Sequence, residues 1–489
     1  MKITLVSLDP ELYCLGIRVL SACLRQAGHD VRCIFLPPRA SKTEKVRKFK
    51  VEHSPGLLDQ VRSLCLNSDL IGISLMTNQF IQAVTITNHL KAQGVGGPIV
   101  WGGIQPTVEP EACLEHADIV CLGEGEDALV ELVNRMVNQR PYSDIKNLWF
   151  KSKDGIIRNA LRPLLQNLDV VPFPDYSCKD DFVRVGDHVE KLTKEKLVEY
   201  QGERIRAAEQ GINYPIMAGR GCLFACTYCC NSVYRRLYPD QKQLRWRSTD
   251  RVIEELEMVQ KEIAPLACVY FVDDDITAQS SEKLRAFGEK FQKAIGVPFF
   301  AQVSPLTITE EKMETLLSAG CTKIVMGVET ASERVAGIYN RDRSHRANPA
   351  AISLIEKFRP RMKLPPTYQF IIDNPYESLD ETVQTLRFAA NLPKPWDNPI
   401  YSLMLFPGTP LYEKAQSDGL IKDKYSEIYG KDWNDHSKPF FKLWIRLYRA
   451  NAPRPLLHLL LARWIVRMLS SRLADSLWRT RFLRWLWDK

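Results

Sequence analysis

Three cysteines in one short segment have the types and spacing needed for metal chemistry. Cys222, Cys226 and Cys229 form a C-x3-C-x2-C pattern directly after a short apolar run at residues 216–218. Thiolates this close in one loop can converge on a single cofactor, and iron–sulfur clusters are held by cysteine thiolates at such spacings. A closed zinc site usually takes four ligands in two separated pairs, whereas the next cysteine, Cys230, directly adjoins Cys229. Three ligands leave one iron open for reaction, so the segment predicts a reactive iron–sulfur centre.

The cysteine segment lies near the start of the second of two series in which short apolar runs alternate with helical patterns. In the first series we expect strands at residues 3–7, 31–35, 70–74, 98–101 and 119–122, with helices near 15–27, 56–66, 78–93 and 125–137. In the second series we expect strands at residues 216–218, 268–272, 299–303, 323–327, 367–371 and 401–405, with helices near 249–262, 281–294, 309–318, 350–357 and 379–391. This alternation is typical of parallel sheets covered by helices, so the chain is predicted to be an α/β protein. The second series predicts a partial (β/α)6 barrel, whose chemistry lies at the carboxyl ends of its strands.

These patterns divide the chain into four segments. We expect a Rossmann-like domain over residues 1–150, a linker over 151–205, a barrel domain over 206–420 and an α-helical C-terminal region over 421–489. The expected linker contains a proline-rich turn at residues 172–175 and a highly charged stretch from 179 to 206. Such features are typical of a connection between domains.

Small and polar residues follow three of the expected strands in the first domain. In open parallel sheets, ligands bind at the carboxyl ends of the strands. Glycine at these positions lets a ligand approach the backbone closely, although glycines that merely end strands are the alternative. The candidate ligand-binding residues are Ser74, Thr77, Gly102, Gly103, Gln105, Gly123 and Glu124.

The cysteine segment resembles the signature of the radical S-adenosylmethionine (SAM) enzymes. The resemblance covers Arg220-Gly221-Cys222, Cys226 and the pair Tyr228-Cys229, in which an aromatic residue precedes the third cysteine. It implies a [4Fe-4S] cluster on the three cysteines, with SAM bound to the open iron and cleaved to a 5′-deoxyadenosyl radical. It also implies an external reductant such as flavodoxin or ferredoxin.

Residues at the ends of the next strands agree with this family. Asp273 and Asp274 end the second barrel strand, where the family binds the SAM amino group, although adjacent aspartates could equally form a solvated turn or a helix cap. Gln302 ends the third strand, and Glu329 lies in a G-x-E-T segment that resembles a family element at the end of the fourth. With Tyr228, these residues are the candidate SAM contacts. The segment at residues 372–378 departs from the glycine-rich turn of the family.

The first domain resembles the cobalamin-binding domain that precedes the barrel in one subclass of this family. The similarity lies in residues 101–107, 122–126 and 172–175, and the two resemblances together cover about residues 1–420. They imply that cobalamin lies between the domains and that the candidate residues of the first domain contact it. The D-x-H-x-x-G motif that supplies an axial histidine to cobalt is absent, so we expect no histidine ligand. A degenerate domain that binds nothing is the alternative.

The composition excludes several classes of protein. The chain has 489 residues, of which 45% are hydrophobic and 25% are charged. These values exclude a disordered chain, a collagen-like repeat and a small scaffold held by disulfides. Thirteen cysteines without a recognisable secretory signal predict a cytoplasmic protein whose cysteines are reduced.

The net charge of +8 is concentrated at the C-terminus. Residues 438–489 carry twelve lysines and arginines against two aspartates, a net charge of +10 that leaves −2 for residues 1–437. The same segment contains five of the ten tryptophans, which are Trp444, Trp464, Trp478, Trp485 and Trp487. The chain is therefore expected to be nearly neutral up to a basic, aromatic tail.

The tail also has helical periodicity. Ile465, Leu469, Leu473 and Leu477 recur every four residues, which predicts an amphipathic helix. Its uncharged runs are too short to span a bilayer, which takes about 20 apolar residues. Arginine and tryptophan on such a helix favour a position in a membrane interface, so we expect peripheral contact with the inner face of the membrane. A helical cap on the barrel is the first alternative, and binding to nucleic acid is the least favoured.

Together these features predict a cobalamin-dependent radical SAM enzyme that methylates, or cyclises, an unactivated carbon. The expected substrate is a hydrophobic small molecule or lipid, including a tetrapyrrole. One rival is a radical SAM enzyme that modifies RNA, but the strands of the RNA-binding β-barrel usual in that class are not apparent after residue 420. The other rival is a non-catalytic iron–sulfur protein that binds a membrane or a nucleic acid.

Overall fold

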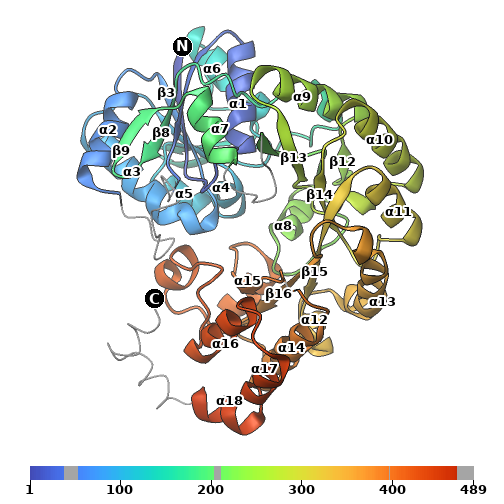
Figure 1. Cartoon of the computed structure of the whole chain (residues 1–489). Coiled ribbons are helices and arrows are strands. Elements are labelled where there is room, and N and C mark those ends of the chain that lie inside the picture. The colour runs from blue at the N-terminus through green and yellow to red at the C-terminus, as the bar shows by residue number, and fades with distance from the viewer. Residues whose placement is uncertain (38–52, 203–210, 396, 471–489) are drawn as a thin grey trace.

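Two α/β units and a helical C-terminal region make up the chain (Figure 1). The structure is a computed structural model that describes residues 1–37, 53–202, 211–395 and 397–470. The first unit contains a nine-stranded sheet and the second a six-stranded parallel sheet, which confirms the expected α/β class. In Figure 1 the second unit curves away from the first, and the C-terminal helices lie at its far end.

The first sheet is built around six parallel strands. Its strands are β1 (Lys2–Ser7), β2 (Asp30–Phe35), β3 (Leu70–Ser74), β4 (Ile99–Gly102), β5 (Ile119–Cys121), β6 (Leu148–Ser152), β7 (Gly155–Arg158), β8 (Asp181–Val185) and β9 (His188–Lys191). They lie in the order β7-β6-β5-β4-β3-β1-β2-β8-β9. The strands from β5 to β8 in this order are parallel, and the outer strands β6, β7 and β9 pair antiparallel. All of β1 except its first residue is buried, as expected for a central strand covered on both faces.

Part of the segment expected to be a linker belongs to this sheet. Strands β7, β8 and β9 lie within residues 151–205 and extend the sheet at both edges. The expectation of a simple linker is wrong here because β7 and β9 are short edge strands with mostly exposed side chains. Such strands lack the apolar pattern that reveals a buried strand in a sequence.

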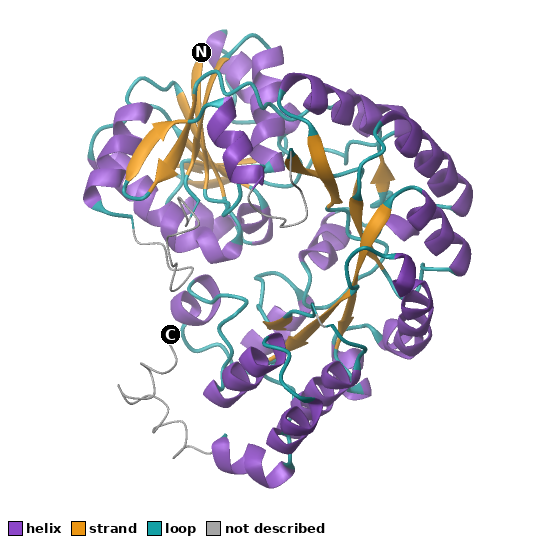
Figure 2. Cartoon of the chain, viewed as in Figure 1, coloured by secondary structure: helices purple, strands orange, loops and turns teal. Residues whose placement is uncertain are grey.

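The second sheet confirms the predicted partial barrel. Its strands are β10 (Ile212–Ile216), β13 (Leu266–Phe271), β14 (Phe299–Val303), β15 (Cys321–Glu329), β16 (Thr367–Ile372) and β17 (Ile400–Ser402). All neighbouring pairs are parallel and follow chain order. Figure 2 shows the strands forming a curved inner layer with helices on the outside. All six strand carboxyl ends therefore lie at one edge of the sheet.

Eight of the nine predicted helices begin within two residues of the expected position, whereas the helix expected near residues 350–357 begins at Asp342. They are α1 (Leu15–Gln26), α2 (Pro55–Cys65), α3 (Phe80–Ala92), α4 (Ile104–Val108), α5 (Pro110–Leu114), α6 (Glu126–Val137), α7 (Lys194–Gly202), α8 (Cys230–Leu237), α9 (Thr249–Glu262), α10 (Ser281–Ala294), α11 (Glu310–Ser318), α12 (Glu333–Ile338), α13 (Asp342–Phe358), α14 (Leu379–Asn391), α15 (Pro410–Ser417), α16 (Pro439–Arg449), α17 (Arg454–Leu460) and α18 (Arg463–Leu469). Most barrel helices start at a serine or threonine whose side chain accepts a hydrogen bond from the first turn. These N-cap residues are Ser248, Ser280, Thr309, Ser332, Ser378 and Thr409.

The first barrel strand lies earlier than predicted. The sequence predicts it at residues 216–218, whereas β10 ends at Ile216. The chain then turns into a short antiparallel pair, β11 (Gly219–Arg220) with β12 (Arg245–Trp246). The apolar residues Met217 and Ala218 therefore connect two strands, and this connection leads directly into the cysteine loop.

The first part of the basic tail packs against the barrel. Trp444 of α16 is fully buried, stacks on Tyr448 at 5.3 Å between ring centroids, and donates a hydrogen bond from Nε1 to the carbonyl of Leu457 at 3.0 Å. The expectation that Trp444 supports a membrane contact is wrong, because its ring belongs to the hydrophobic core. Trp464 of α18 is 66% exposed. Leu473, Leu477, Trp478, Trp485 and Trp487 lie outside the described residues.

A segment just before these helices contacts the first unit. The single π-helical turn η5 (Tyr425–Tyr429) places Tyr429 against Phe80 of α3, with ring centroids 4.0 Å apart. Tyr429 also donates a hydrogen bond to Glu109 at 2.5 Å, and Lys424 forms an ion pair with the same carboxylate.

Among the described residues, no helix has the length and apolar character needed to cross a bilayer.

We expect Trp444→Ala to lower the free energy of unfolding by about 3–5 kcal/mol, because it leaves a large cavity in the core. Thermal unfolding followed by circular dichroism measures the effect as a lower Tm. The matched variant Trp464→Ala removes an exposed ring and should change stability by less than about 0.5 kcal/mol. Equal shifts for the two variants would contradict the packing of α16 against the barrel.

Candidate functional site

The cysteine loop connects β11 to α8 at the carboxyl edge of the barrel. Arg235 of α8 holds the loop by donating to the carbonyls of Cys222 and Phe224, at 2.7 and 3.2 Å. On the other side, Thr227 donates from its backbone amide to the carbonyl of Tyr339 at 3.1 Å. The loop is therefore fixed by contacts at both ends before any cofactor is considered.

The three cysteines fit an iron–sulfur cluster by their chemistry. Cys226 is buried, and burial raises the pKa of its thiol, whereas the guanidinium of Arg341 lowers it. Arg341 Nη1 lies 3.5 Å from Cys226 Sγ, close enough to stabilise a thiolate. Within the described ranges, no group of three or more His, Cys, Asp or Glu side chains could hold a single metal ion. A four-iron cluster requires no such group, since each thiolate binds a different iron.

The two candidate aspartates after β13 have different environments. Asp273 is buried, and its carboxylate accepts hydrogen bonds from the amides of Ala218 and Gly219 at 3.1 and 2.5 Å. Burial raises the pKa of Asp273 to about 7. Asp273 therefore fixes the chain that leads into the cysteine loop. Asp274 is exposed and accepts a hydrogen bond from Asn231 at 2.9 Å.

The other candidate SAM residues lie at the ends of the next strands. Glu329 ends β15, is buried, and lies 3.9 Å from Arg341 Nη1. Burial raises the pKa of Glu329, while Arg341 and the Tyr228 hydroxyl lower it. The Tyr228 ring packs edge-on against Tyr339 at 4.9 Å. Gln302 is half-buried near the end of β14.

One cavity joins the two units. Its volume is about 440 Å³, and residues of the first sheet and of the cysteine loop line it together. The first unit contributes the ends of β3, β4 and β5, and the barrel contributes Cys222, Asp273 and Asp274. The lining also includes Cys230 and apolar side chains of α1. The cavity therefore connects the predicted ligand-binding edge of the first sheet to the cysteine loop.

The structure brings together five of the seven candidate residues of the first unit. Thr77 and Gln105 do not line the cavity. Both are buried, and Gln105 donates a hydrogen bond to Glu109 at 2.9 Å. Tyr228, Gln302 and Glu329 also lie outside the cavity lining. The candidate residues that do line the cavity are Ser74, Gly102, Gly103, Gly123, Glu124, Asp273 and Asp274.

Two glycines at the cavity are required by close packing. Gly103 has φ 101°, and a Cβ there would lie 2.8 Å from the carbonyl oxygen of Leu75. Gly123 has φ 69°, and a Cβ there would lie 2.2 Å from the Tyr238 hydroxyl, which follows α8. Both conformations are unfavourable for residues with a Cβ. Gly123 therefore allows the first unit to approach the barrel closely.

A network of ion pairs connects the units beside the cavity. Glu124 Oε1 accepts from Arg220 at 2.9 Å and from Arg245 at 2.8 Å, and Arg220 also pairs with Glu126 at 2.6 Å. Burial opposes ionisation of Glu124, but the two guanidinium groups hold its pKa below the usual value. Arg220 immediately precedes the cysteine loop, so this network fixes the loop relative to the turn after β5.

The network and the arginines around the cysteines were not found by sequence reasoning. Arg235 is separated from Cys222 by 13 residues, and Arg341 is separated from Cys226 by 115 residues. The contact between Arg341 and Cys226 cannot be inferred from local spacing, because the two residues are far apart in the sequence. Arg235 could not be singled out because arginines are common on helix surfaces. Only Arg220 could be noticed in the sequence, because it belongs to the motif that resembles the radical SAM signature.

The atypical segment after β16 forms a polar cluster with the C-terminal region. Asp373 has φ 67°, and its carboxylate accepts from His436 Nδ1 at 3.1 Å and from the Ser437 hydroxyl. These contacts lower the pKa of Asp373 although burial opposes this. Burial raises the pKa of the nearby Glu377 to about 8. The segment is thus fixed by side chains rather than by the glycines of the family.

We expect Arg220→Ala to weaken the contact between the units by about 1–3 kcal/mol, because it leaves Glu126 without this partner in a partly buried site. Differential scanning calorimetry should show a lower Tm for the transition in which the units separate. The matched variant Arg135→Ala removes two ion pairs, with Glu131 and Asp144, that lie inside the first unit. A loss of the same size for Arg135→Ala would contradict a special role of Arg220.

Two family models match the chain. The B12 binding domain matches residues 1–133, and the radical SAM superfamily matches residues 216–389. The first match contains β1 to β5 with the turns that line the cavity, and the second contains the cysteine loop and strands β13 to β16.

Three curated proteins are similar in sequence. An uncharacterized methyltransferase of Pyrococcus horikoshii is 26% identical over 414 residues, which cover 83% of this chain and 79% of that protein. The bacteriochlorophyllide d C-8(2)-methyltransferase of Chlorobaculum tepidum is 21% identical, and the match covers 76% of this chain and 74% of that protein. The anaerobic magnesium-protoporphyrin IX monomethyl ester cyclase of Cereibacter sphaeroides is 24% identical, and the match covers 67% of this chain and 50% of that protein.

Two solved structures have the same fold. OxsB, a cobalamin-dependent SAM radical enzyme with aqua-cobalamin and SAM bound, has a TM-score of 0.66 and 17% identity over 99% of this chain and 75% of that chain. The radical SAM methyltransferase TsrM from Kitasatospora setae, with cobalamin and a [4Fe-4S] cluster bound, has a TM-score of 0.63 and 16% identity over 85% of this chain and 78% of that chain. The solved structures share the fold of this chain, and the two family models show that the chain carries a radical SAM domain after a B12-binding domain.

Proposed function

We propose that the protein is a cobalamin-dependent radical SAM methyltransferase that acts on an unactivated carbon of a hydrophobic substrate. The observation that carries the proposal is the cavity of about 440 Å³, whose lining combines the glycine-rich strand ends of the first unit with Cys222 of the cysteine loop. Two cofactors that react with one another need such a shared space. Cyclisation of the substrate is the alternative outcome of the same radical chemistry.

The residues that would hold each cofactor follow from their positions. Cys222, Cys226 and Cys229 would hold a [4Fe-4S] cluster, and the cavity between the units would hold part of cobalamin. Together with SAM, these groups supply a carbon-centred radical and a methyl donor. Among the described residues that line the cavity there is no histidine.

The chain itself would bind and orient SAM at the barrel edge. Asp274 is exposed near the cysteine loop, and a carboxylate there suits the SAM amino group. Asp273 has both oxygens on backbone amides, so it would act by holding the loop in place. Arg341 would favour the charged forms of Cys226 and Glu329 against the effect of burial, since it lies beside both side chains. Gln302 and Tyr228 remain proposed contacts.

The substrate would lie on the inner face of the barrel. Side chains alternate along a strand, so Phe300 and Gln302 of β14 face the same side. A cavity of about 580 Å³ on this face has the aromatic side chains of Tyr270, Phe300 and Tyr401 in its lining, together with the charged side chains of Lys323, Asp397 and Arg449. It lies toward the amino ends of β16 and β17. An aromatic wall favours a flat molecule. A tetrapyrrole is flat, and two of the relatives act on tetrapyrroles according to their names. A lipid is the other proposed substrate.

The RNA-modifying rival is less well supported. In that class we expected a C-terminal β-barrel, whereas the described residues after β17 form helices and turns and contain no strand. The second rival, a non-catalytic iron–sulfur protein, does not account for the cavity between the units.

We expect anaerobic reconstitution with iron, sulfide and cobalamin, followed by SAM and a reductant, to yield 5′-deoxyadenosine. Cys226→Ala should lower the yield of 5′-deoxyadenosine to background, because the substitution removes one cluster ligand. The iron content of this variant should fall as well. The adjacent Cys230→Ala is the matched control and should retain the iron and sulfide content of wild type. Failure of the wild type to form 5′-deoxyadenosine or to bind cobalamin would overturn the proposal.

A specific observation supports a peripheral membrane contact by α17 and α18. Leu459, Trp464 and Met468 are 56%, 66% and 54% exposed, and Arg463 and Arg467 lie among them. Exposed apolar side chains beside arginines suit the interface of an anionic membrane.

We expect Leu459→Glu/Trp464→Glu to reduce co-flotation of the protein with liposomes that contain anionic lipid. The matched control Val137→Glu/Val170→Glu places the same charges at exposed apolar positions of the first unit and its connection, and it should float like wild type. Flotation that is absent in wild type, or equal in all three proteins, would rule out this membrane contact.

A further inference from the structure

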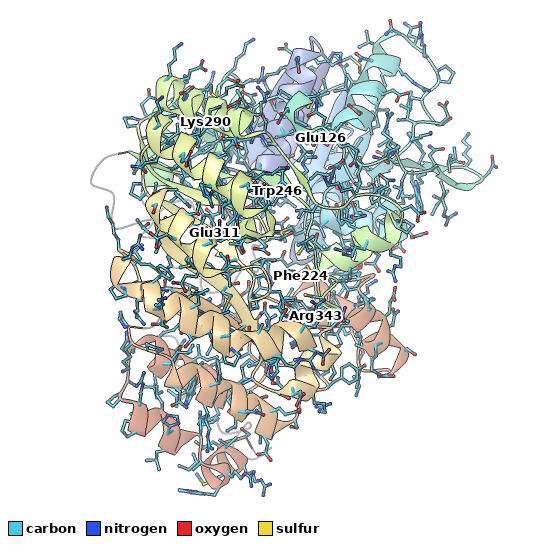
Figure 3. The ribbon with its side chains drawn as sticks, turned by 90° about the vertical axis from the view of Figure 1, so that its right-hand side faces the viewer. Glu126, Phe224, Trp246, Lys290, Glu311 and Arg343 are labelled. Carbon is cyan, nitrogen blue, oxygen red and sulfur yellow. The ribbon has the colours of Figure 1, made fainter. Side chains whose placement is uncertain are left out.

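A second hollow lies on the outer side of the cysteine loop. It has a volume of about 500 Å³, and its lining includes Cys222, Leu223 and Trp246. Cys222, Arg235 and Gln243 also line the cavity between the units, so the inner cavity and the outer groove meet at these three residues. Figure 3 views this side and shows Trp246 beside the outer helices and below Glu126 of the first unit, with Phe224 further down. A molecule in the groove would therefore lie next to the cluster without entering the SAM or cobalamin space.

The charge of the groove is entirely positive. Arg235, Lys242 and Lys283 line it, and no aspartate or glutamate is among the described lining residues. Arg235 is used to hold the carbonyls of Cys222 and Phe224. Lys242 and Lys283 are exposed, and neither forms a salt bridge with a described residue. The two lysines thus contribute nothing evident to the fold and leave their charge available to an acidic partner.

Two further features make the groove suitable for an acidic partner. The groove contains Ser280, the N-cap of α10, so the positive end of a 14-residue helix adds to the potential of the lysines. Leu223, immediately after the first cluster cysteine, is 48% exposed. An apolar residue surrounded by cations is typical of a small interface in which charge directs the approach and a few apolar contacts fix the position.

We propose that this groove is the docking site of an acidic one-electron carrier protein that reduces the cluster through Cys222. The inference rests on the proposed function, which requires an external electron. In the step itself, one electron leaves the carrier and one arrives on the cluster. With a flavin carrier, the anionic hydroquinone loses one electron to become the semiquinone, and no atom passes between the proteins. Contacts between redox proteins are small and transient, so a few exposed side chains beside the cluster are enough to form one.

The test uses reduced flavodoxin as the probe and the variant Lys242→Glu/Lys283→Glu. Biolayer interferometry measures the affinity of flavodoxin for the full chain at low and at high salt. Stopped-flow absorbance measures the rate of cluster reduction by flavodoxin and by dithionite. The matched control is Lys153→Glu/Lys191→Glu, which changes the net charge equally at exposed positions near β7 and β9, on the edges of the first sheet.

For the groove variant we expect an affinity and a reduction rate at low salt that are lower than wild type by about tenfold or more, because steering by opposite charges is lost. Added salt should weaken wild-type binding, since it screens exposed charges. The control variant should behave like wild type, and reduction by dithionite should be the same in all three proteins.

Several results would overturn the docking proposal. The first is flavodoxin binding by the groove variant that equals that of wild type. The second is a loss of binding in the control variant as large as in the groove variant. The third is a groove variant whose reduction by dithionite, which needs no docking surface, is slowed as much as its reduction by flavodoxin. A short single-stranded RNA that binds through Lys242 and Lys283, while flavodoxin does not bind, would assign the groove to nucleic acid instead. Failure of the proposed function is distinguished by the binding assay, which is independent of SAM cleavage and of cobalamin.

Discussion

The position of Glu124 between two arginines is the interaction on which the rest of the site depends. Its carboxylate belongs to the turn after β5 in the first unit, whereas Arg220 and Arg245 belong to the short strands β11 and β12 of the second. Charge-assisted contacts of this kind are directional, so they set the distance and the angle between the two units. The relative position of the cavity, the cysteine loop and the glycine-rich strand ends therefore depends on this contact.

The sequence predicted the regular parts of the molecule well because their signals are local. Buried parallel strands are short apolar runs, and β14 was predicted with its observed bounds. The cysteine loop was equally visible because its ligands lie within eight residues of one another. The strands β7 and β9 were missed since exposed edge strands carry no apolar pattern. Arg341 and the ion pairs of Glu124 were missed for another reason, since they depend on segments about a hundred residues apart.

Cys222 has a different environment on each of its two sides. On the inner side is a mostly apolar cavity bounded by two units, and on the outer side is an open groove with three cations. The carbonyl of Cys222 is held by Arg235, so the loop cannot easily move toward either side. Arg235 and Gln243 line both spaces as well, so the inner cavity and the outer groove meet at a layer of three side chains around the cysteine loop.

The two units touch at several places, and two of these contacts lie far apart along the chain. One is the ion-pair network around Glu124, and another is the packing of Tyr429 on Phe80, more than 200 residues further along the chain from Arg220. The first unit is therefore bound both by the segment that precedes the cysteine loop and by a segment that follows the last strand of the barrel. A change in the distance between the units would have to break contacts at both ends of the barrel, so the volume of the cavity between them is constrained from two directions.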